Sequence, residues 1–548
     1  MSTLSSRSTA KVQSLRTPDL DKSARPLDAS GALAKAVAFH LSGKREEALQ
    51  ELQRTAAAGE GSAEVYVAMG YIHFELGQFE EAAGSYRSLV KQKPQHPTGW
   101  FNLAVCLERL GSWREAAENF EKAAALDPTH LEAHLGLGIC RLRLNESGPA
   151  RASFEKCLEL SPDNEGARFG NAVALQMEGR TDDAARLYHS ILESNPESEE
   201  ALSNLILIGL ARDDFEMVRE YSERLLDFRP ESTVALEGLA TWASAGGDHA
   251  LTAKFCTLLV SAVPGHFEGW FNLGLAYQKS GRWEEAADAY AEALRLRPQS
   301  SQVYTNLGIV REELGDVAGA KEAYNRAIQA DTSASAPQWN LALLLEHSGQ
   351  VSEAEQAFAQ LLKRNPGDEE ARFRLGCLRL KRDDYAGAAE VFEVCLKRRP
   401  QWAEAQANLA LAYSGMGERA RAQRAYEEIL EYEPKSIDAL RGLASLALES
   451  SDMETALEYH VRLTDMGERT PGILYNAGLL YHKTEQYEKA ARMYREALEA
   501  QPDMPEALLN LGHVLDELGQ KQEARACWNK ALEAKPALAQ GYFGPPLQ

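Results

Sequence analysis

Asparagine recurs along the chain at separations that are multiples of 34 residues, and its side chain is suited to binding other polypeptides. The eight members of this set are Asn102, Asn204, Asn272, Asn306, Asn340, Asn408, Asn476 and Asn510. Asparagine is a mediocre residue for the interior of a helix, so its recurrence needs a reason. A row of amides, each with two donors and an acceptor, can hold the backbone of an extended peptide without reading its side chains. The set therefore predicts a peptide-binding surface.

Large aromatic residues occupy the position just before the asparagine position in several copies of this spacing. They are Phe101, Phe169, Phe271, Trp339, Phe373 and Tyr475. Aromatic rings offer a large apolar area and a polarisable face. Two interpretations stay open: the rings form pockets for apolar anchors of a bound segment, or they pack against the adjoining helix.

Acidic residues recur four positions before the asparagine position, at Glu64, Glu132, Glu200, Glu268, Glu370, Glu404, Asp438 and Glu506. They suit a basic ligand, but they also lie where we expect the first turn of a helix, which a negative charge stabilises by about 0.3–1 kcal/mol. The whole chain has 59 basic and 81 acidic residues and a net charge of −22. This balance weighs against nucleic acid as a partner. It favours proteins or peptides with basic or apolar segments.

No residue pattern predicts catalysis, a cofactor or a metal site. A Gly-rich phosphate loop, a Ser-His-Asp set and a His-rich zinc motif are all missing from the sequence. The seven cysteines have no metal-ligand spacing, and we expect them to be reduced thiols. We therefore expect a non-enzymatic protein.

The sequence also indicates where the protein acts. It has no apolar run of the roughly 18 residues that a membrane span needs, and its first residues lack an apolar signal core. These features predict a cytoplasmic protein that does not bind membranes.

The asparagine spacing belongs to a 34-residue repeat that runs from about residue 29 to about residue 538. We number positions within each repeat from its first residue, so that residue 97 is position 1 and the asparagine set is position 6. In residues 97–130 the apolar residues recur at helical spacing, first at Trp100, Leu103, Ala104 and Leu107, then, after Gly111, at Ala116, Phe120 and Ala123. Each repeat is therefore predicted to form two short helices, each with one buried stripe.

Three further features have a mechanical reason. Small residues at position 8, such as Gly70, Ala104 and Gly138, and Ala at position 20 let two helices approach to about 8 Å. Proline at position 32, as at Pro94 and Pro128, cannot continue a helix and separates one repeat from the next.

The 34-residue period, the W-x2-L-G-x2-Y opening of residues 270–277, the A-x3-F second helix and the closing proline resemble the tetratricopeptide repeat. The resemblance implies an all-α fold, a right-handed α-solenoid of about fifteen tandem helix-turn-helix units whose first helices line the inner surface. The asparagine row is similar to the asparagine ladder in the superhelical repeat arm of O-linked N-acetylglucosamine transferases. Asparagine at this position is also common in tetratricopeptide repeats generally, so a structural role stays open.

The repeat also predicts the domain organisation. Residues 1–28 lack the periodicity and are expected to form a disordered leader. Residues 29–538 are expected to form one continuous superhelix. Residues 539–548 begin a sixteenth repeat, because Tyr542 and Phe543 are in register with Trp270 and Phe271, but Pro545 stops it.

Our leading hypothesis is a scaffold whose inner surface binds extended or helical segments of partner proteins. One alternative is an architectural subunit that self-associates head to tail through its uncapped C-terminal repeat. Another is an adaptor that brings substrates to an enzyme on a separate chain.

Overall fold

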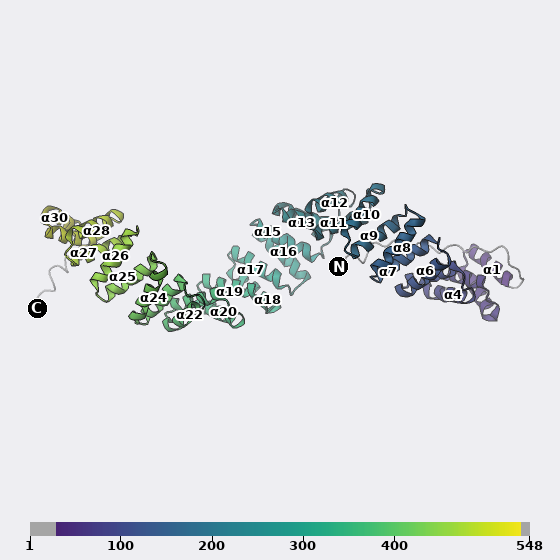
Figure 1. Cartoon of the computed structure of the whole chain (residues 1–548), viewed down its shortest axis with the longest axis horizontal. Coiled ribbons are helices and arrows are strands. Elements are labelled where there is room, and N and C mark those ends of the chain that lie inside the picture. Colours follow the sequence, from purple (N-terminus) through teal and green to yellow (C-terminus); the bar gives the residue numbers. More distant parts are fainter. Residues whose placement is uncertain (1–28, 539–548) are drawn as a thin grey trace. The chain divides into compact units, whose positions relative to one another are not determined.

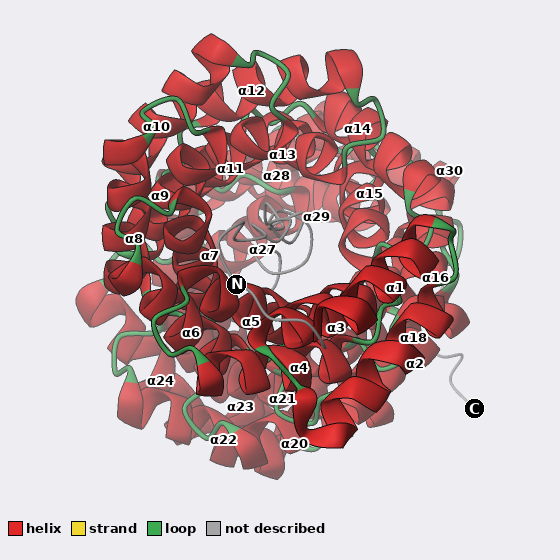
Figure 2. Ribbon diagram, turned by 90° about the vertical axis from the view of Figure 1, so that its right-hand side faces the viewer, coloured by secondary structure: helices red, strands yellow, loops and turns green. Residues whose placement is uncertain are grey.

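The computed structural model describes residues 29–538 of the 548-residue chain. Within that range it contains thirty α-helices and no strand (Figure 2), so the predicted all-α fold with two helices per repeat is confirmed. The predicted leader and the truncated sixteenth repeat lie outside the described residues. The chain divides into two compact units, unit 1 up to Ala289 and unit 2 from Tyr290, with the division inside helix α16. That residues 29–538 form a single right-handed superhelix stays a prediction.

Unit 1 contains the first fifteen helices and the start of the sixteenth, and neighbouring helices pack side by side in chain order (Figure 1). Their bounds are α1 Ala29–Leu41, α2 Arg45–Thr55, α3 Ala63–Glu75, α4 Phe79–Gln92, α5 Pro97–Arg109, α6 Trp113–Leu126, α7 Leu131–Arg143, α8 Ser147–Leu160, α9 Glu165–Met177, α10 Thr181–Ser194, α11 Glu199–Ala211, α12 Phe215–Phe228, α13 Thr233–Ala245, α14 His249–Ala262, α15 Phe267–Lys279 and α16 Trp283–Leu296. A π-helical turn, Ala56–Glu60, follows α2.

Unit 2 continues the same alternation of first and second helices. Their bounds are α17 Ser301–Glu313, α18 Val317–Ala330, α19 Ser335–His347, α20 Val351–Arg364, α21 Glu369–Lys381, α22 Tyr385–Arg398, α23 Ala403–Gly415, α24 Arg419–Tyr432, α25 Ile437–Glu449, α26 Met453–Asp465, α27 Pro471–Lys483, α28 Tyr487–Ala500, α29 Pro505–Glu517 and α30 Lys521–Ala534.

The turn between the two helices of a repeat uses a left-handed residue at position 15. Gly111 has φ 74° and Gly315 has φ 75° there. Such a residue ends a helix by letting its backbone cap the last turn, and glycine adopts this conformation without steric cost. Asn145 takes the same conformation in place of glycine, with φ 63°.

The small residue at position 8 is explained by the aromatic ring at position 24 of the same repeat. A Cβ atom added to Gly308 would lie 2.3 Å from the Tyr324 ring, and one added to Gly138 would lie 2.6 Å from the Phe154 ring. Both rings are fully buried. These contacts confirm that position 8 sets how closely the two helices of a repeat approach.

In several repeats the side chain at position 4 bonds to the repeat before it. Trp100 Nε1 donates a hydrogen bond to the carbonyl oxygen of Pro94 at 2.8 Å, and Trp270 Nε1 donates to that of Pro264 at 3.0 Å. Arg168 Nε makes the equivalent bond to the Pro162 carbonyl oxygen at 2.9 Å. The proline at position 32 has a carbonyl oxygen that can accept a hydrogen bond, and the side-chain N–H at position 4 of the next repeat donates to it.

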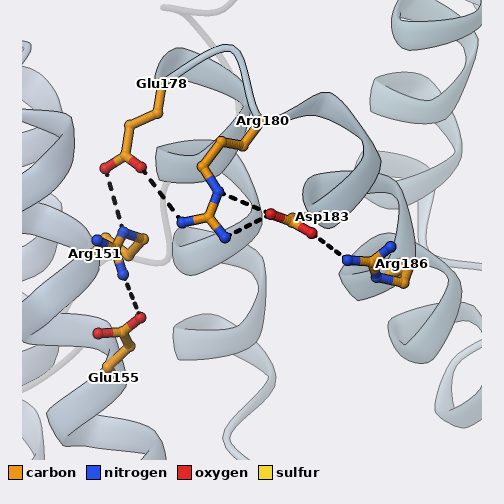
Figure 3. A network of polar contacts seen from close by, with 6 residues as sticks. All are labelled: Arg151, Glu155, Glu178, Arg180, Asp183 and Arg186. Carbon is orange, nitrogen blue, oxygen red and sulfur yellow. Dashed lines mark hydrogen bonds and ion pairs between the residues drawn. The ribbon is translucent and has the colours of Figure 1, made fainter.

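Ion pairs also join neighbouring repeats, and a continuous series of them links α8 to α10 (Figure 3). It alternates positive and negative side chains in the order Glu155, Arg151, Glu178, Arg180, Asp183 and Arg186. Arg151 Nε lies 3.3 Å from Glu178 Oε1, and this contact crosses from one repeat to the next. Each exposed pair contributes little to stability, so packing of the repeats carries most of it.

Candidate functional site

The predicted binding residues, which are the asparagines at position 6, the aromatic residues at position 5 and the acidic residues at position 2, all lie on first helices. In unit 1, Figure 2 shows the first helices α7, α11, α13 and α15 nearer the axis of the curve than the second helices α8, α10, α12 and α14. We call the side chains at positions 5, 6, 9 and 12 of a first helix its first-helix face.

The first-helix face of α5 is buried. Phe101 and Val105 are 0% exposed, Asn102 is 3% exposed and Glu108 is 9% exposed. A side chain this buried offers nothing to a ligand in this conformation. That Phe101 and Asn102 take part in peptide binding stays a prediction.

The remaining predicted residues of unit 1 differ from one another in accessibility. Asn204 is 7% exposed, and its Nδ2 donates to the backbone oxygen of Glu200 at 2.8 Å. Asn272 is exposed. Phe271 is half-buried, with its ring stacked 6.4 Å from that of Phe267.

In unit 2 the predicted asparagines are within reach of solvent. Asn306, Asn340, Asn408, Asn476 and Asn510, on α17, α19, α23, α27 and α29, are all half-buried. Because position 6 recurs on each first helix, these amides form a row along the unit, interrupted by Arg374 on α21 and Gly442 on α25.

Part of this row has internal partners. Burial raises the pKa of the Tyr290 phenol, and a hydrogen bond to Asn306 opposes that rise. Burial and the Glu312 carboxylate raise the pKa of Tyr324, and a hydrogen bond to Asn340 acts in the opposite direction. Tyrosine at position 24 of one repeat therefore pairs with asparagine at position 6 of the next. This contact gives the asparagine recurrence a structural cause.

Where position 24 of the preceding repeat is phenylalanine, position 6 is often glycine. A Cβ atom on Gly136 would lie 2.6 Å from the Phe120 ring, and one on Gly170 would lie 2.4 Å from the Phe154 ring. Asn408 follows Phe392 and uses another partner, with Nδ2 donating to Cys377 Sγ at 3.7 Å. Gly442 meets a tyrosine ring instead, since a Cβ atom there would lie 2.3 Å from Tyr426, so the ring at position 24 does not by itself determine the residue at position 6.

The aromatic residues at position 5 pack against the position-24 ring of their own repeat. The ring-centroid distances are 5.7 Å for Phe101–Phe120, 5.7 Å for Phe169–Tyr188, 5.6 Å for Trp339–Phe358, 5.8 Å for Phe373–Phe392 and 5.9 Å for Tyr475–Tyr494. Five of the six predicted rings thus have the packing role that was left open. Phe169, Trp339, Phe373 and Tyr475 remain half-buried, so their outer edges are still accessible.

A row of aliphatic side chains at position 9 was missed by the sequence reasoning. In unit 2 it consists of Ile309, Leu343, Leu411 and Leu479, and it is interrupted by Cys377 and Ser445. Ile309, Leu343 and Leu479 are half-buried, and Leu411 is 51% exposed. The recurrence of aliphatic residues at multiples of 34 residues is the feature of the sequence that could have predicted this row.

Some of the acidic residues at position 2 form ion pairs with lysines of the same repeat. Lys93 Nζ donates to Glu64 Oε1 at 2.9 Å and lowers the pKa of that carboxyl to about 2. Lys535 Nζ lies 2.6 Å from Glu506 Oε1 and lowers its pKa as well. Glu404 is exposed on α23, beside the aliphatic row.

Unit 2 also has a cavity of about 380 Å³ lined by side chains of α16, α17 and α18. Three arginines line it, but Arg295 pairs with Glu292 at 2.8 Å and Arg326 pairs with Glu322 at 2.7 Å. These pairs compensate most of its positive charge.

Residues 29–538 contain neither a metal-binding cluster nor a membrane-spanning helix. No group of three His, Cys, Asp or Glu side chains in this range is placed to hold a metal ion. None of the helices there combines the length and apolar character that crossing a membrane requires.

Several solved structures have weak similarity to the chain. A chain of the structure of Naa15/Naa10 bound to HypK-THB has 14% sequence identity and a TM-score of 0.33, with 92% of this chain and 94% of that chain covered. MamA 41-end from Desulfovibrio magneticus RS-1 has 22% identity and a TM-score of 0.29, covering 30% of this chain and 94% of that one. A crystal structure of MamA has 22% identity and a TM-score of 0.28, covering 30% and 96%. No curated protein matches the chain.

Sequence models of a repeat family match most of the described chain. Two models, both of the tetratricopeptide repeat, match residues 67–128, 107–165, 258–337 and 339–402, and residues 148–207, 379–446 and 481–541. The matches agree with the helix pairs, the position-8 contacts and the turns described above. The chain therefore belongs to the tetratricopeptide repeat family.

Proposed function

We propose that the protein is a non-enzymatic scaffold that binds segments of partner proteins on the first-helix face of unit 2. The observation that supports this most is the set of solvent-accessible amides and aliphatic side chains on α17, α19 and α23. Repeat proteins stack short helical units and use the extended concave surface that results for binding.

The chemistry of this face indicates the kind of segment that it would hold. Amides at position 6 can bond to the main chain of a peptide. Ile309, Leu343 and Leu411 provide apolar area beside them, and Leu411 gains most from being covered because it is 51% exposed. Exposed Glu404, together with the net charge of −22, favours basic residues in the partner.

The bound segment is therefore expected to be extended or helical, with apolar anchors and a positive charge. An adaptor that presents substrates to an enzyme on another chain would use the same face. Cytoplasmic localisation is part of this proposal, since a scaffold of this kind needs access to other intracellular chains.

The test separates the binding role of the asparagines from their structural role. Partners captured from a lysate and identified by mass spectrometry supply a peptide, and its affinity is measured by calorimetry for the intact chain. Replacing Asn306, Asn340 and Asn408 with alanine is expected to weaken binding by about tenfold or more, because three hydrogen bonds contribute about 0.5–1.5 kcal/mol each.

Tyr290→Phe and Tyr324→Phe are the matched controls. They remove the internal partner of Asn306 and of Asn340 and leave the amides in place. We expect these two variants to keep the peptide affinity of the natural chain. If they weaken binding as much as the asparagine variant does, the amides act only through the fold and the proposal is wrong.

A further inference from the structure

The cavity lined by α16, α17 and α18 contains one arginine, Arg311, that differs from the other two. Those two pair with glutamates, whereas Arg311 forms no ion pair within residues 29–538. Its one hydrogen bond in this range runs from Nη1 to the carbonyl oxygen of Gly319 at 3.0 Å. A guanidinium carries several N–H donors, so this half-buried side chain keeps donors for a further acceptor.

Arg311 is at position 11 of its repeat, and the arginines at position 11 of other repeats do have a carboxylate partner. Arg141 Nη2 lies 2.7 Å from Glu121 Oε1, and Arg379 Nε lies 3.3 Å from Glu355 Oε1. Both glutamates belong to the preceding repeat. All three arginines donate from Nη1 to the backbone oxygen at position 19 of their own repeat. This shared bond places the three guanidinium groups alike.

The sequence of the preceding repeat explains why Arg311 lacks such a partner. At position 25, from which Glu121 supplies its carboxylate, the repeat before Arg311 has Ala291. At position 21, which Glu355 occupies in its own repeat, it has Ala287. Ala291 and Arg311 both line the cavity. The replacement of glutamate by alanine therefore leaves room beside a guanidinium that no described carboxylate pairs with.

We propose that this cavity binds a glutamate side chain of a partner protein, whose carboxylate takes the place beside Arg311 that Glu121 has beside Arg141. The planar fork of a guanidinium matches a carboxylate with two parallel hydrogen bonds. The residues next to the glutamate are aliphatic, because Leu294 and Leu307 also line the cavity. The volume of about 380 Å³ is within the range of ligand pockets, about 300–1,000 Å³.

This site differs from the first-helix face of unit 2 in its place and in its charge. The residues of α17 that line the cavity are Tyr304, Leu307 and Arg311, at positions 4, 7 and 11, whereas the first-helix face has positions 5, 6, 9 and 12. The lining contains three arginines and one glutamate, so it favours an acidic segment.

The consequence is a second binding site of opposite preference. The first-helix face selects basic segments and the cavity selects a glutamate between aliphatic residues, so unit 2 binds two kinds of segment independently.

Two peptide libraries test the proposal in the full chain. Short capped peptides with a central glutamate and random flanking residues are passed over the immobilised protein, and a matched library has glutamine at the centre. Retained peptides are identified by mass spectrometry, and the affinity of the most enriched peptide is measured by calorimetry. We expect the protein to enrich the glutamate library over the glutamine library, with leucine, isoleucine or valine beside the glutamate.

Two variants remove the site in different ways. Arg311→Gln removes the guanidinium, whereas Ala291→Glu keeps it and supplies a carboxylate from the chain itself, as Glu121 does for Arg141. Ala291 is exposed and glutamate is a good helix former, so this second variant is expected to fold. Each variant should weaken binding of the enriched peptide by about tenfold or more, the effect of losing a hydrogen bond between charged groups.

Ala359→Glu is the matched control. It adds the same side chain at position 25 of the next repeat, where the arginine that follows, Arg379, already pairs with Glu355. This variant should keep the affinity of the natural chain. Circular dichroism checks that all three variants are folded.

Equal retention of the glutamate and glutamine libraries would overturn the proposal. So would an enriched peptide whose affinity Ala291→Glu leaves unchanged, or one that Ala359→Glu weakens as much as Ala291→Glu does. The proposed function fails separately, since it is judged by asparagine substitutions on the first-helix face, which contributes no residue to the lining of the cavity.

Discussion

The first-helix faces of α5 and α21 have the same positions in the repeat and opposite accessibility. Phe101, Asn102, Val105 and Glu108 are all buried on α5, whereas their counterparts on α21 are all half-buried. Both helices come from the same 34-residue pattern and pack against the same kinds of neighbour. The repeat therefore determines where a side chain lies on its helix, and the surroundings of each unit determine whether a ligand can reach it.

The largest expected effect comes from removing a ring from each face. Phe101→Ala should lower the free energy of unfolding by about 3–5 kcal/mol, because Phe101 is fully buried against Phe120 and His130. Phe373→Ala should cost roughly half as much, because Phe373 is half-buried. Urea unfolding followed by circular dichroism measures both, and equal losses would remove the contrast between the two faces.

Substitution of the small residue at position 8, which contacts the ring at position 24, should have a similar effect in the two units. Gly138→Ala and Gly308→Ala should each destabilise the protein by about 1–3 kcal/mol, because the added Cβ would lie 2.6 Å from Phe154 and 2.3 Å from Tyr324. Gly84→Ala is the control, since a Cβ there meets nothing within 4 Å on helix α4. It should stabilise the protein by about 0.5–1 kcal/mol. A loss in only one unit would mean that the position-8 contact is not general.

Much of this core could be predicted from the sequence. The small residue at position 8 recurs in all repeats but the one with Ile206, and an aromatic residue occupies position 24 in most repeats. The close contact between the two positions follows from the helix pair. The hydrogen bond from Trp100 to Pro94 was not predicted, although both residues were noted, because a bond across the boundary of two repeats depends on how they stack.

The candidate surface was predicted only in part. The recurrence of asparagine located position 6 correctly on each first helix, but it gave no information on burial, so Asn102 and Asn306 had the same predicted role. Their difference in burial depends on the packing around each helix, which a local repeat pattern does not contain. The pairing of Tyr324 with Asn340 joins two repeats and could have been noticed from the joint recurrence of tyrosine and asparagine.

A smaller effect is expected from this tyrosine–asparagine contact. Tyr324→Phe should lower the free energy of unfolding by about 0.5–1.5 kcal/mol, because its hydroxyl donates to Glu312 at 3.1 Å and also bonds to Asn340. The equivalent residue of an earlier repeat in unit 1, Phe154, has no hydroxyl and is followed by Gly170. Thermal unfolding of Tyr324→Phe measures this loss. An unchanged transition would show that the contact does not explain the asparagine recurrence.

The smallest effect concerns an ion pair that occurs at the same repeat positions in each unit, Glu64–Lys93 in unit 1 and Glu506–Lys535 in unit 2. The Lys93 ammonium lowers the pKa of Glu64 to about 2, below the value of about 4.3 expected in the unfolded chain. Because the folded-state pKa is the lower one, the stabilisation is present above about pH 4.3 and is lost as the pH falls towards 2. Glu64→Gln should therefore make the thermal midpoint less sensitive to pH in this range.

Glu506, paired with Lys535 in unit 2, should behave in the same way, since its pKa is also lowered. High salt should weaken both effects because the pairs are partly exposed. A pH dependence that is the same in Glu64→Gln and in the natural chain would contradict the assignment.

The central claim is that the first-helix face of unit 2 contacts partner segments, and one photochemical measurement tests it most directly. A photoreactive amino acid is placed in the full chain at Leu411 on the first helix α23, which is 51% exposed, or at Val394 on the second helix α22, which is 38% exposed. Each chain is irradiated with its purified partner peptide. We predict cross-linking from position 411 that excess unlabelled peptide suppresses, and only background from position 394. Equal cross-linking from the two positions, or more from position 394, would contradict the account.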